Sequence, residues 1–522
     1  MKKLISILLA VTIALSVVGC QFIPGLQPTE PTEPTEPPAN VTPPADTDVV
    51  LTINKEDGNK VVFGVGTELD PHFFSQNVGL SGTSNGTQWT CKEEDWALFE
   101  QRMEDMKLKR IRVMLLPSWF IINETNTEAG IYDWDTDCMK SLYRVLDSAM
   151  KFGMKVNITM WGVDAGTPGF MRQEGNPAWT CPPGEKYEEL FVACFADCIK
   201  YLREEKGYTC IREVTLFNEP NSIYIGNKAN EEYCALCTKM HYAFEEKGVR
   251  DDVLFNLSDD ARDAVWMAKT LMNLEGIIDV ANSHTYSLGD TFNQETQESM
   301  RDMSNQEICY DLPLYNLNEW KQWADEYPNI PHIWGEFGTC NGAGSHQTFD
   351  KYTPERGLEI ARIALNMFNM GSQGMSYWVL FSQYYGRSDF NIGKIMDMGL
   401  WGFADEGYQC RPVYYSYSMI TRFIEESDAI FPIMSSDEHI VAVAFRQGEK
   451  WSYCVVNNGD DAKKVSFVNM DNFPGELTRY VYDEANVPTD NQVIGASGTV
   501  EADGRVITDT VEGRTFVIYT NK

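Results

Sequence analysis

The sequence predicts an α/β fold, a (β/α)8 TIM barrel followed by a C-terminal antiparallel β-sandwich. Short apolar segments alternate with longer amphipathic ones eight times over about 340 residues, which is the pattern of a barrel of parallel strands and covering helices. Several apolar segments are hydrophobic almost throughout, as strands buried on both faces of a parallel sheet are. From about residue 416 the hydrophobic period changes to two, which is typical of antiparallel strands.

The first residues of the chain have the pattern of a targeting segment. Lys2 and Lys3 precede an apolar run, residues 4–18, that is too short to span a bilayer comfortably and has the order of an export signal. The run ends in Val17-Val18-Gly19-Cys20, which resembles a bacterial lipobox. This resemblance implies that residues 1–19 are a lipoprotein signal peptide and that Cys20 is lipidated. The alternative is a plain cleaved signal with an incidental cysteine.

Residues 20–48 are predicted to be a linker rich in proline, threonine and glutamate. Proline recurs at every third position from Pro28 to Pro37, which favours extended polyproline II and excludes helix and sheet. At about 3.1 Å per residue, some 25 such residues reach roughly 75 Å. We therefore expect a body that is lipid-anchored at the extracellular face of the bacterial cell membrane and held away from it.

The predicted barrel spans residues 49–415. Its candidate strands are 61–66, 109–115, 155–161, 212–218, 253–258, 278–284, 331–337 and 374–380. Candidate helices are 96–106, 139–152, 187–205, 229–247, 261–273 and 355–370. A doubly wound open sheet is the alternative, but Gly64-Val65-Gly66 lacks the third glycine of a dinucleotide-binding turn.

The predicted β-sandwich spans residues 416–522. A last helix-like segment, 416–426, precedes candidate strands at 438–447, 450–458, 462–470, 477–484 and 514–521. Turn signals such as Gly448-Glu449 and Asn458-Gly459 separate them. We expect this domain to brace the barrel, with glycan binding as the alternative.

Composition restricts the partners. The chain has 522 residues and a formal net charge of −33, which argues against nucleic acid and anionic lipid headgroups because both attract clustered Lys and Arg. We expect a monomer that touches a membrane only through its lipid. The 13 cysteines permit disulfides after export without defining their pairing. Cys234 and Cys237 have a metal-like spacing but no second pair at finger distance, so buried or bridged cysteines are expected and not zinc.

Two glutamates stand where a barrel enzyme carries its catalytic groups, at the carboxyl ends of strands. The fourth predicted strand runs into Glu219, and the seventh contains Glu336. In glycosidic hydrolysis one carboxyl group donates a proton to the leaving oxygen while an ionised partner attacks. The sequence contains no metalloprotease, nucleophile-elbow or phosphate-loop motif, so no cofactor and no metal are expected.

The segments around both glutamates resemble clan A glycoside hydrolases. Residues 216–220, Leu-Phe-Asn-Glu-Pro, resemble the Asn-Glu-Pro motif that closes the fourth strand of this clan. Residues 333–338, Ile-Trp-Gly-Glu-Phe-Gly, resemble its nucleophile strand and are most like family 5, which is cellulase- and mannanase-like. The resemblance covers about residues 60–415 and implies a retaining mechanism with Glu219 as acid/base and Glu336 as nucleophile. The end of the first strand does not match family 5, which leaves families 39 and 30 and an unassigned member of the clan open.

The resemblance also implies substrate-binding roles at other strand ends. Asn218 would bond the sugar 2-hydroxyl, and Arg112 would orient the nucleophile. His284-Thr285-Tyr286 resembles the clan's His-x-Tyr, whose tyrosine contacts the nucleophile. The alternatives are a satisfied core histidine and a buried packing tyrosine.

Aromatic side chains can stack on the C–H faces of sugars. Trp378 on the eighth strand resembles the aromatic floor below the −1 sugar, and Trp161 is a second platform candidate; both could instead be core residues. In the same way, Glu219 could be a carboxylate favoured at a helix start, and Glu336 could be a structural ion-pair partner of Arg112.

Further acidic residues follow two strands. Asp259-Asp260 is predicted to lie in a solvated loop. Glu68, Asp70 and His72 form a cluster that fits loop hydrogen bonding and a sugar subsite equally well.

The sequence thus predicts a retaining glycoside hydrolase that cleaves β-linked β-glucan, mannan or xylan, or their oligosaccharides, at the cell surface. The alternative is a catalytically inactive glycan-binding lipoprotein of the same architecture.

Overall fold

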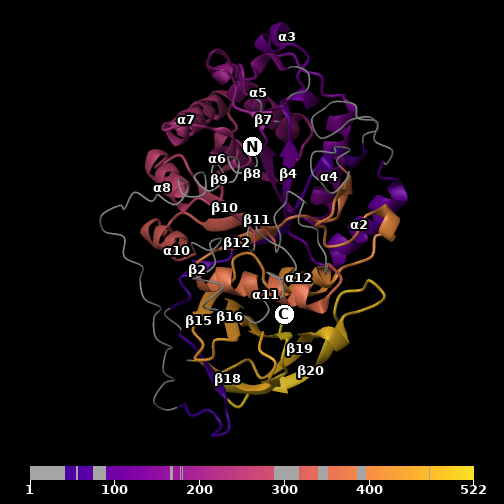
Figure 1. Cartoon of the computed structure of the whole chain (residues 1–522), viewed down its shortest axis with the longest axis vertical. Helices are drawn as coiled ribbons and strands as arrows, with labels where there is room; N and C mark the ends of the chain where they lie inside the picture. Colours follow the sequence, from indigo (N-terminus) through magenta and orange to yellow (C-terminus); the bar gives the residue numbers. More distant parts are fainter. Residues whose placement is uncertain are drawn as a thin grey trace, which may run out of the picture. The chain divides into compact units, whose positions relative to one another are not determined.

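The computed structural model describes residues 41–54, 57–74, 90–164, 169–176, 178, 180–286, 317–338, 351–384, 395–469 and 471–522. The predicted signal peptide, Cys20 and most of the linker lie outside these residues. Eight parallel strands form a closed barrel, which confirms the predicted fold class (Figure 1). The strands are β3 (Gly64–Leu69), β4 (Arg110–Leu115), β5 (Lys155–Met160), β8 (Ile211–Thr215), β9 (Leu254–Ala261), β10 (Val280–Tyr286), β11 (His332–Gly338) and β12 (Gly374–Tyr377).

Helices follow the strands. They are α2 (Glu93–Asp105), α4 (Asp137–Phe152), α5 (Glu188–Lys200), α7 (Ala229–Lys247), α8 (Ala264–Asn273), α10 (Leu317–Glu326), α11 (Pro354–Asn369) and α12 (Pro412–Phe423). Short elements between them are α3 (Glu124–Glu128), α6 (Pro220–Ile223), β6 (Val163–Asp164), β7 (Thr180–Cys181), β13 (Gln383–Tyr384) and β14 (Ile395–Met396).

The ends of α4 show how local sequence sets these boundaries. The Thr136 hydroxyl accepts a hydrogen bond from Met139 N at 3.2 Å, and Gly153 ends the helix in the left-handed region. Across the described residues, we find no helix with the length and apolar character needed to cross a bilayer.

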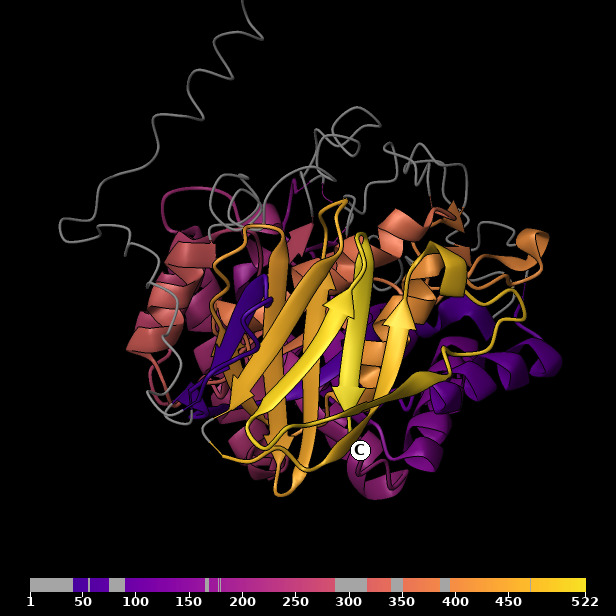
Figure 2. The same cartoon turned by 90° about the horizontal axis from the view of Figure 1, so that it is seen from below.

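The C-terminal region is built of two sheets (Figure 2). The larger one has the order β2-β15-β16-β17-β22-β19-β20, and the smaller one β1-β18-β21. Their strands are β1 (Val49–Ile53), β2 (Lys60–Val61), β15 (Ala429–Ile433), β16 (Ile440–Gln447), β17 (Lys450–Asn457), β18 (Lys463–Asn469), β19 (Glu476–Tyr482), β20 (Ala496–Glu501), β21 (Val506–Val511) and β22 (Thr515–Thr520).

The N-terminal boundary of the barrel differs from the prediction, which assigned residues 49–415 to it. β1 pairs in parallel with β18, and β2 pairs with β15, so residues 49–61 contribute strands to the sandwich. Leu51 and Ile53 are fully buried in the sandwich core with Phe467. A lone apolar strand before the barrel carries no local sign of which sheet it will join, because its partner lies about 400 residues later. At the other boundary, α12 already begins at Pro412.

α11 and α12 pack between the barrel and the larger sheet (Figure 1). The Tyr482 hydroxyl on β19 donates to the Pro354 carbonyl at 2.5 Å, and the Asn369 amide donates to the Ala442 carbonyl at 3.1 Å. These part-buried hydrogen bonds join α11 to the larger sheet, and the bracing role stays a prediction.

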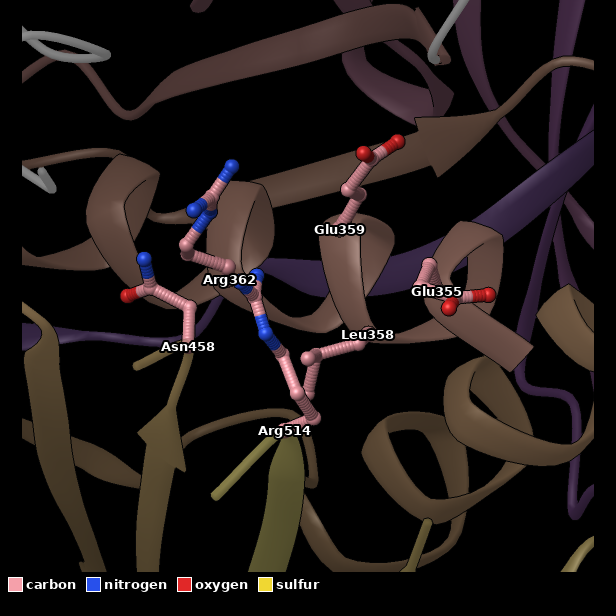
Figure 3. A pocket seen from close by; sticks show the side chains of 6 residues that line it. All are labelled: Glu355, Leu358, Glu359, Arg362, Asn458 and Arg514. Carbon is pink, nitrogen blue, oxygen red and sulfur yellow. The ribbon is translucent and has the colours of Figure 1, made fainter. Parts of the chain in front are cut away.

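A small pocket lies where α11 meets the ends of β17 and β22 (Figure 3). Its lining is mostly charged or polar: Glu355, Leu358, Glu359, Arg362, Asn458 and Arg514. It shares no residue with the candidate site below.

Ten of the cysteines lie in the described part of the chain, and all ten are buried and free of disulfides. Burial raises the pKa of Cys198 and Cys237 well above the usual range, which keeps both thiols protonated. Bridged cysteines are therefore not found among these ten.

Candidate active site

Glu219 lies four residues after the last residue of β8 and precedes the first residue of α6. Its backbone is in the left-handed region at φ +48°, and Pro220 occupies the first turn of the helix. The carboxylate makes no capping hydrogen bond to the helix. Instead its Oε1 lies 3.2 Å from Nδ1 of His284, and the side chain is 30% exposed. The alternative that Glu219 is a carboxylate stabilised at a helix start therefore does not account for this contact with His284. Left-handed backbone at a residue other than glycine is strained and is found at functional sites.

Glu336 lies on β11, and both of its oxygens are held. Arg112 Nη1 donates to Oε1 at 2.7 Å, and the Tyr286 hydroxyl donates to Oε2 at 2.7 Å. The residue before it must be glycine, because a Cβ at Gly335 would collide with the side chain of Asn282. Glu336 is thus an ion-pair partner of Arg112, which the sequence offered as an alternative to a catalytic role. The same carboxylate also lies close to Glu219.

The two candidate carboxylates are close neighbours. An oxygen of Glu219, an oxygen of Glu336 and a ring nitrogen of His284 all lie within 4.8 Å of one another. Retaining glycosidases place their carboxyl groups about 5–5.5 Å apart, whereas inverting enzymes leave about 6.5–9.5 Å for a water molecule. One oxygen of Glu219 and one oxygen of Glu336 therefore lie closer together than the carboxyl groups of inverting enzymes.

Arg112 on β4 organises the floor of the site. Besides Glu336, its guanidinium donates to Glu68, to Asn218 Oδ1 at 2.8 Å and to Asp259 Oδ2 at 2.7 Å. Glu68 and Arg112 are direct neighbours in the pairing of β3 with β4, and both are fully buried. The structure thus brings Arg112 into contact with Asn218 and Glu336, and the roles predicted for Arg112 and Asn218 stay predictions.

The buried charges have distinct protonation preferences. Burial, together with Glu336 and Asp70, raises the pKa of Glu68 well above its usual range although Arg112 opposes the shift, which favours the neutral form of Glu68. Burial would also raise the pKa of Asp259, but Arg112 and His284 outweigh it and lower that pKa.

His284 and Tyr286 leave β10 toward the two glutamates. Burial would lower the pKa of His284, but Glu336 and Asp259 raise it well above its usual range, so the imidazole carries a positive charge. Burial and Glu336 raise the pKa of Tyr286, which keeps its hydroxyl a donor. Both side chains therefore make polar contacts with catalytic candidates and do not merely fill the core.

Trp161 and Trp378 lie together at the barrel mouth. Their rings are nearly parallel, with an interplanar angle of 24° and centroids 6.3 Å apart, and both side chains are largely buried. Both rings belong to the buried hydrophobic core of the barrel, as the core alternative expects, and their role as sugar platforms stays a prediction.

Two acidic positions differ from the sequence prediction. Asp259 and Asp260 were expected in a solvated loop, but both are fully buried. The prediction was wrong because β9 continues to Ala261 and carries both residues into the barrel. In the cluster of Glu68, Asp70 and His72, the Glu68 carboxylate contacts Arg112 in the site. Asp70 and His72 follow it in the sequence and are also buried. The sequence did carry one indication that Asp259 belongs to the site, because two acidic residues stand at the end of a predicted barrel strand.

Glu219, His284 and Glu336 are also close enough to offer ligand atoms to one metal ion. A cation would have to displace the bonds that Arg112 and Tyr286 make to Glu336, and it would meet the positive charges of Arg112 and His284. The donor set fits hydrogen-bonded acid/base chemistry better.

No protein-family model and no curated protein matches the sequence. Solved structures match over most of the chain. The catalytic domain of GH30 xylanase C from Talaromyces cellulolyticus superposes with a TM-score of 0.61 and 13% identity, covering 90% of this chain and 99% of that one. An endo-β1,6-glucanase gives 0.60 and 14% identity, covering 90% and 93%. A GH39 β-xylosidase from Caulobacter crescentus gives 0.55 and 12% identity, covering 90% and 99%.

The chain shares the fold of clan A glycoside hydrolases. Families 30 and 39, which the first strand had left open, are both represented among these structures. The closer likeness to family 5 is not tested by them and stays a prediction.

Proposed function

We propose that the protein is a retaining glycoside hydrolase that cleaves β-glycosidic bonds of a plant-type polysaccharide or its oligosaccharides. The observation that carries the proposal is the pair of carboxylates at the ends of β8 and within β11, with oxygens within 4.8 Å of one another. This spacing favours a double displacement over single-step inversion.

The two glutamates are held in environments suited to different tasks. Glu336 is 6% exposed and takes two hydrogen bonds, from Arg112 and Tyr286, which orient its carboxylate for attack on the anomeric carbon. Glu219 is more exposed and bonds only His284 through its side chain among the described contacts, so it can reach the glycosidic oxygen.

The reaction proceeds in two steps. Glu336 attacks the anomeric carbon while Glu219 donates a proton to the leaving oxygen, which gives a glycosyl-enzyme ester. Glu219 then removes a proton from water, and the water oxygen displaces Glu336 to release a sugar of retained configuration. In this proposal Asn218, which accepts a hydrogen bond from Arg112, bonds the sugar 2-hydroxyl, and Trp161 and Trp378 stack on the sugar.

We propose xylan and β-glucan as the first substrates to test, because similar structures include a xylanase, a β-xylosidase and a β-1,6-glucanase. Mannan remains a candidate from the sequence resemblance. We further propose that lipid on Cys20 holds the enzyme at the extracellular face of the membrane. Replacement of Cys20 by alanine should then move the protein from the membrane fraction to the soluble fraction.

The test is hydrolysis of xylan, β-1,4-glucan, β-1,6-glucan and mannan, and of 4-nitrophenyl β-glycosides of xylose, glucose and mannose. Wild type and Glu336→Gln are compared, with circular dichroism as the folding control. Reducing sugar released by wild type alone supports the proposal, and NMR of the first product reads its configuration. A wild type no faster than Glu336→Gln on every substrate would leave a glycan-binding protein as the function.

A further inference from the structure

Asp259 connects the two halves of the proposed catalytic machinery without touching either glutamate side chain. We propose that Asp259 is a positioning residue, whose carboxylate holds Arg112 on the nucleophile and His284 on the acid/base. This inference rests on the proposed hydrolase function and extends it to a residue outside the carboxylate pair.

The two carboxylate oxygens of Asp259 bond different side chains. Oδ2 accepts from Arg112 Nη2 at 2.7 Å, while Oδ1 bonds Nε2 of His284 at 3.1 Å and accepts from the Asn282 amide at 2.5 Å. Its carbonyl oxygen also accepts from the backbone N of Glu219 at 3.0 Å. One residue therefore fixes an arginine, an imidazole and the main chain of the proposed acid/base.

Both charged groups that Asp259 holds also contact a glutamate of the proposed catalytic pair. Arg112 donates to Glu336 at 2.7 Å. His284 turns Nδ1 toward Glu219 at 3.2 Å and toward Glu336 at 3.6 Å. Asp259 is thus one hydrogen-bonded group away from both glutamates.

The backbone is distorted so that Asp259 points inward. In the pairing of β9 with β10, Asn282 is opposite Ser258 and Ser283 is opposite Asp260, so Asp259 is the extra residue of a bulge. Ser258 and Asp259 both have positive φ, at +77° and +48°. Bulges and left-handed non-glycine residues cost conformational energy and occur where a side chain must be re-aimed at a site.

Charge supports the same role. The titratable groups around Asp259 and His284 come from several elements: Arg112, Glu68, Glu219, Tyr233, Tyr286 and Glu336. Within this set, Asp259 is ionised because Arg112 and His284 lower its pKa. An ionised Asp259 in turn accepts from His284 Nε2 and favours the imidazolium, whose Nδ1–H then points at the glutamates.

The test compares Asp259→Asn with Asp260→Asn. Asparagine keeps the shape of Asp259 but removes the charge that Arg112 and His284 share. Asp260 is the matched control, because it is equally buried but bonds Ser258, Ser283 and the backbone N of Asp263. Thermal unfolding of both variants reports on folding.

The first measurement is the pH dependence of kcat and KM on the 4-nitrophenyl glycoside that wild type cleaves best. Loss of a negative charge lowers the pKa of nearby groups, so both limbs of the profile for Asp259→Asn should move to lower pH by about one unit or more. The kcat should fall about 100-fold with KM little changed, because misplacement of reacting groups slows the chemical step. Asp260→Asn should keep the wild-type profile.

The second measurement does not need activity. NMR of protein with 15N-labelled histidine follows the imidazole of His284, assigned through His284→Gln. In wild type this histidine should stay charged well above the usual range of histidine, and in Asp259→Asn it should lose its proton at a pH at least one unit lower than in wild type. Absence of wild-type activity on all substrates would refute the proposed function, whereas an unshifted pH profile and an unshifted His284 titration in a folded Asp259→Asn would refute this inference.

Discussion

Arg112 Nη1 on β4 lies 2.7 Å from Glu336 Oε1 on β11, across the interior of the barrel. Both side chains are nearly excluded from solvent, so their charges interact with little screening. The ion pair fixes the direction of the glutamate, and Tyr286 fixes its second oxygen. Several variants test whether this arrangement serves catalysis.

Tyr286→Phe removes the hydroxyl that donates to Glu336 Oε2. A hydrogen bond to a charged group is worth about 1.5–3 kcal/mol, so kcat should fall about 10- to 100-fold. Steady-state kinetics on an activated aryl glycoside measures the change, and an unaltered kcat would show that the tyrosine only packs.

Glu219→Ala removes the proposed acid/base. Substrates with poor leaving groups should lose about 10³-fold or more in rate, while dinitrophenyl glycosides, which need no proton, should keep fast formation of the ester. Azide should then restore turnover by attacking the ester, and the product should be a β-glycosyl azide. Equal losses for both kinds of leaving group would contradict the assigned role.

Trp378→Ala should weaken substrate binding more than it slows chemistry. The lost aromatic face corresponds to about 1.5–3 kcal/mol of burial, so KM should rise about tenfold or more. Trp378→Phe keeps a flat ring and should recover most of the affinity. Isothermal titration of Glu336→Gln with oligosaccharides separates binding from turnover.

Glu213→Leu should destabilise the barrel below the site. Arg110 Nη2 and Glu213 Oε2 lie 2.7 Å apart with both side chains buried, and loss of one partner leaves a buried charge. We expect about 3–5 kcal/mol less free energy of unfolding in urea titrations. The double variant Arg110→Met/Glu213→Leu should recover much of this loss, and no recovery would show that packing dominates.

His332 should make stability depend on pH in the acid range. Burial, with a smaller effect of Lys60, lowers the pKa of His332 to about 3, whereas an unfolded histidine titrates near 6.5. The folded-state pKa is depressed, so the stabilising contribution is complete above about pH 6.5 and is lost as pH falls toward 3. In that window His332 should contribute a slope of about 1.4 kcal/mol per pH unit. Unfolding titrations of His332→Gln should show a slope smaller by that amount, and parallel curves would contradict it.

Some features of the fold could be predicted from local pattern. α7 was predicted at the residues where it occurs, because its amphipathic run ends at Gly248. Strand β15 was not predicted, since its short segment with an internal proline has no clear alternation. β1 could not be assigned to the sandwich, because a strand's partner is decided by packing with distant residues.

The candidate site divides in the same way. Glu219 and Glu336 stand in short motifs next to apolar runs, so the sequence by itself determined the barrel, its order of strands and the two carboxylates as a catalytic candidate. Asp259 has no such motif, and a bulge in β9 decides that it faces inward. Only the tertiary structure brought Glu68, Asp259 and Arg112 into contact and set their charges, because burial and neighbouring charges depend on strands that meet only when the barrel closes.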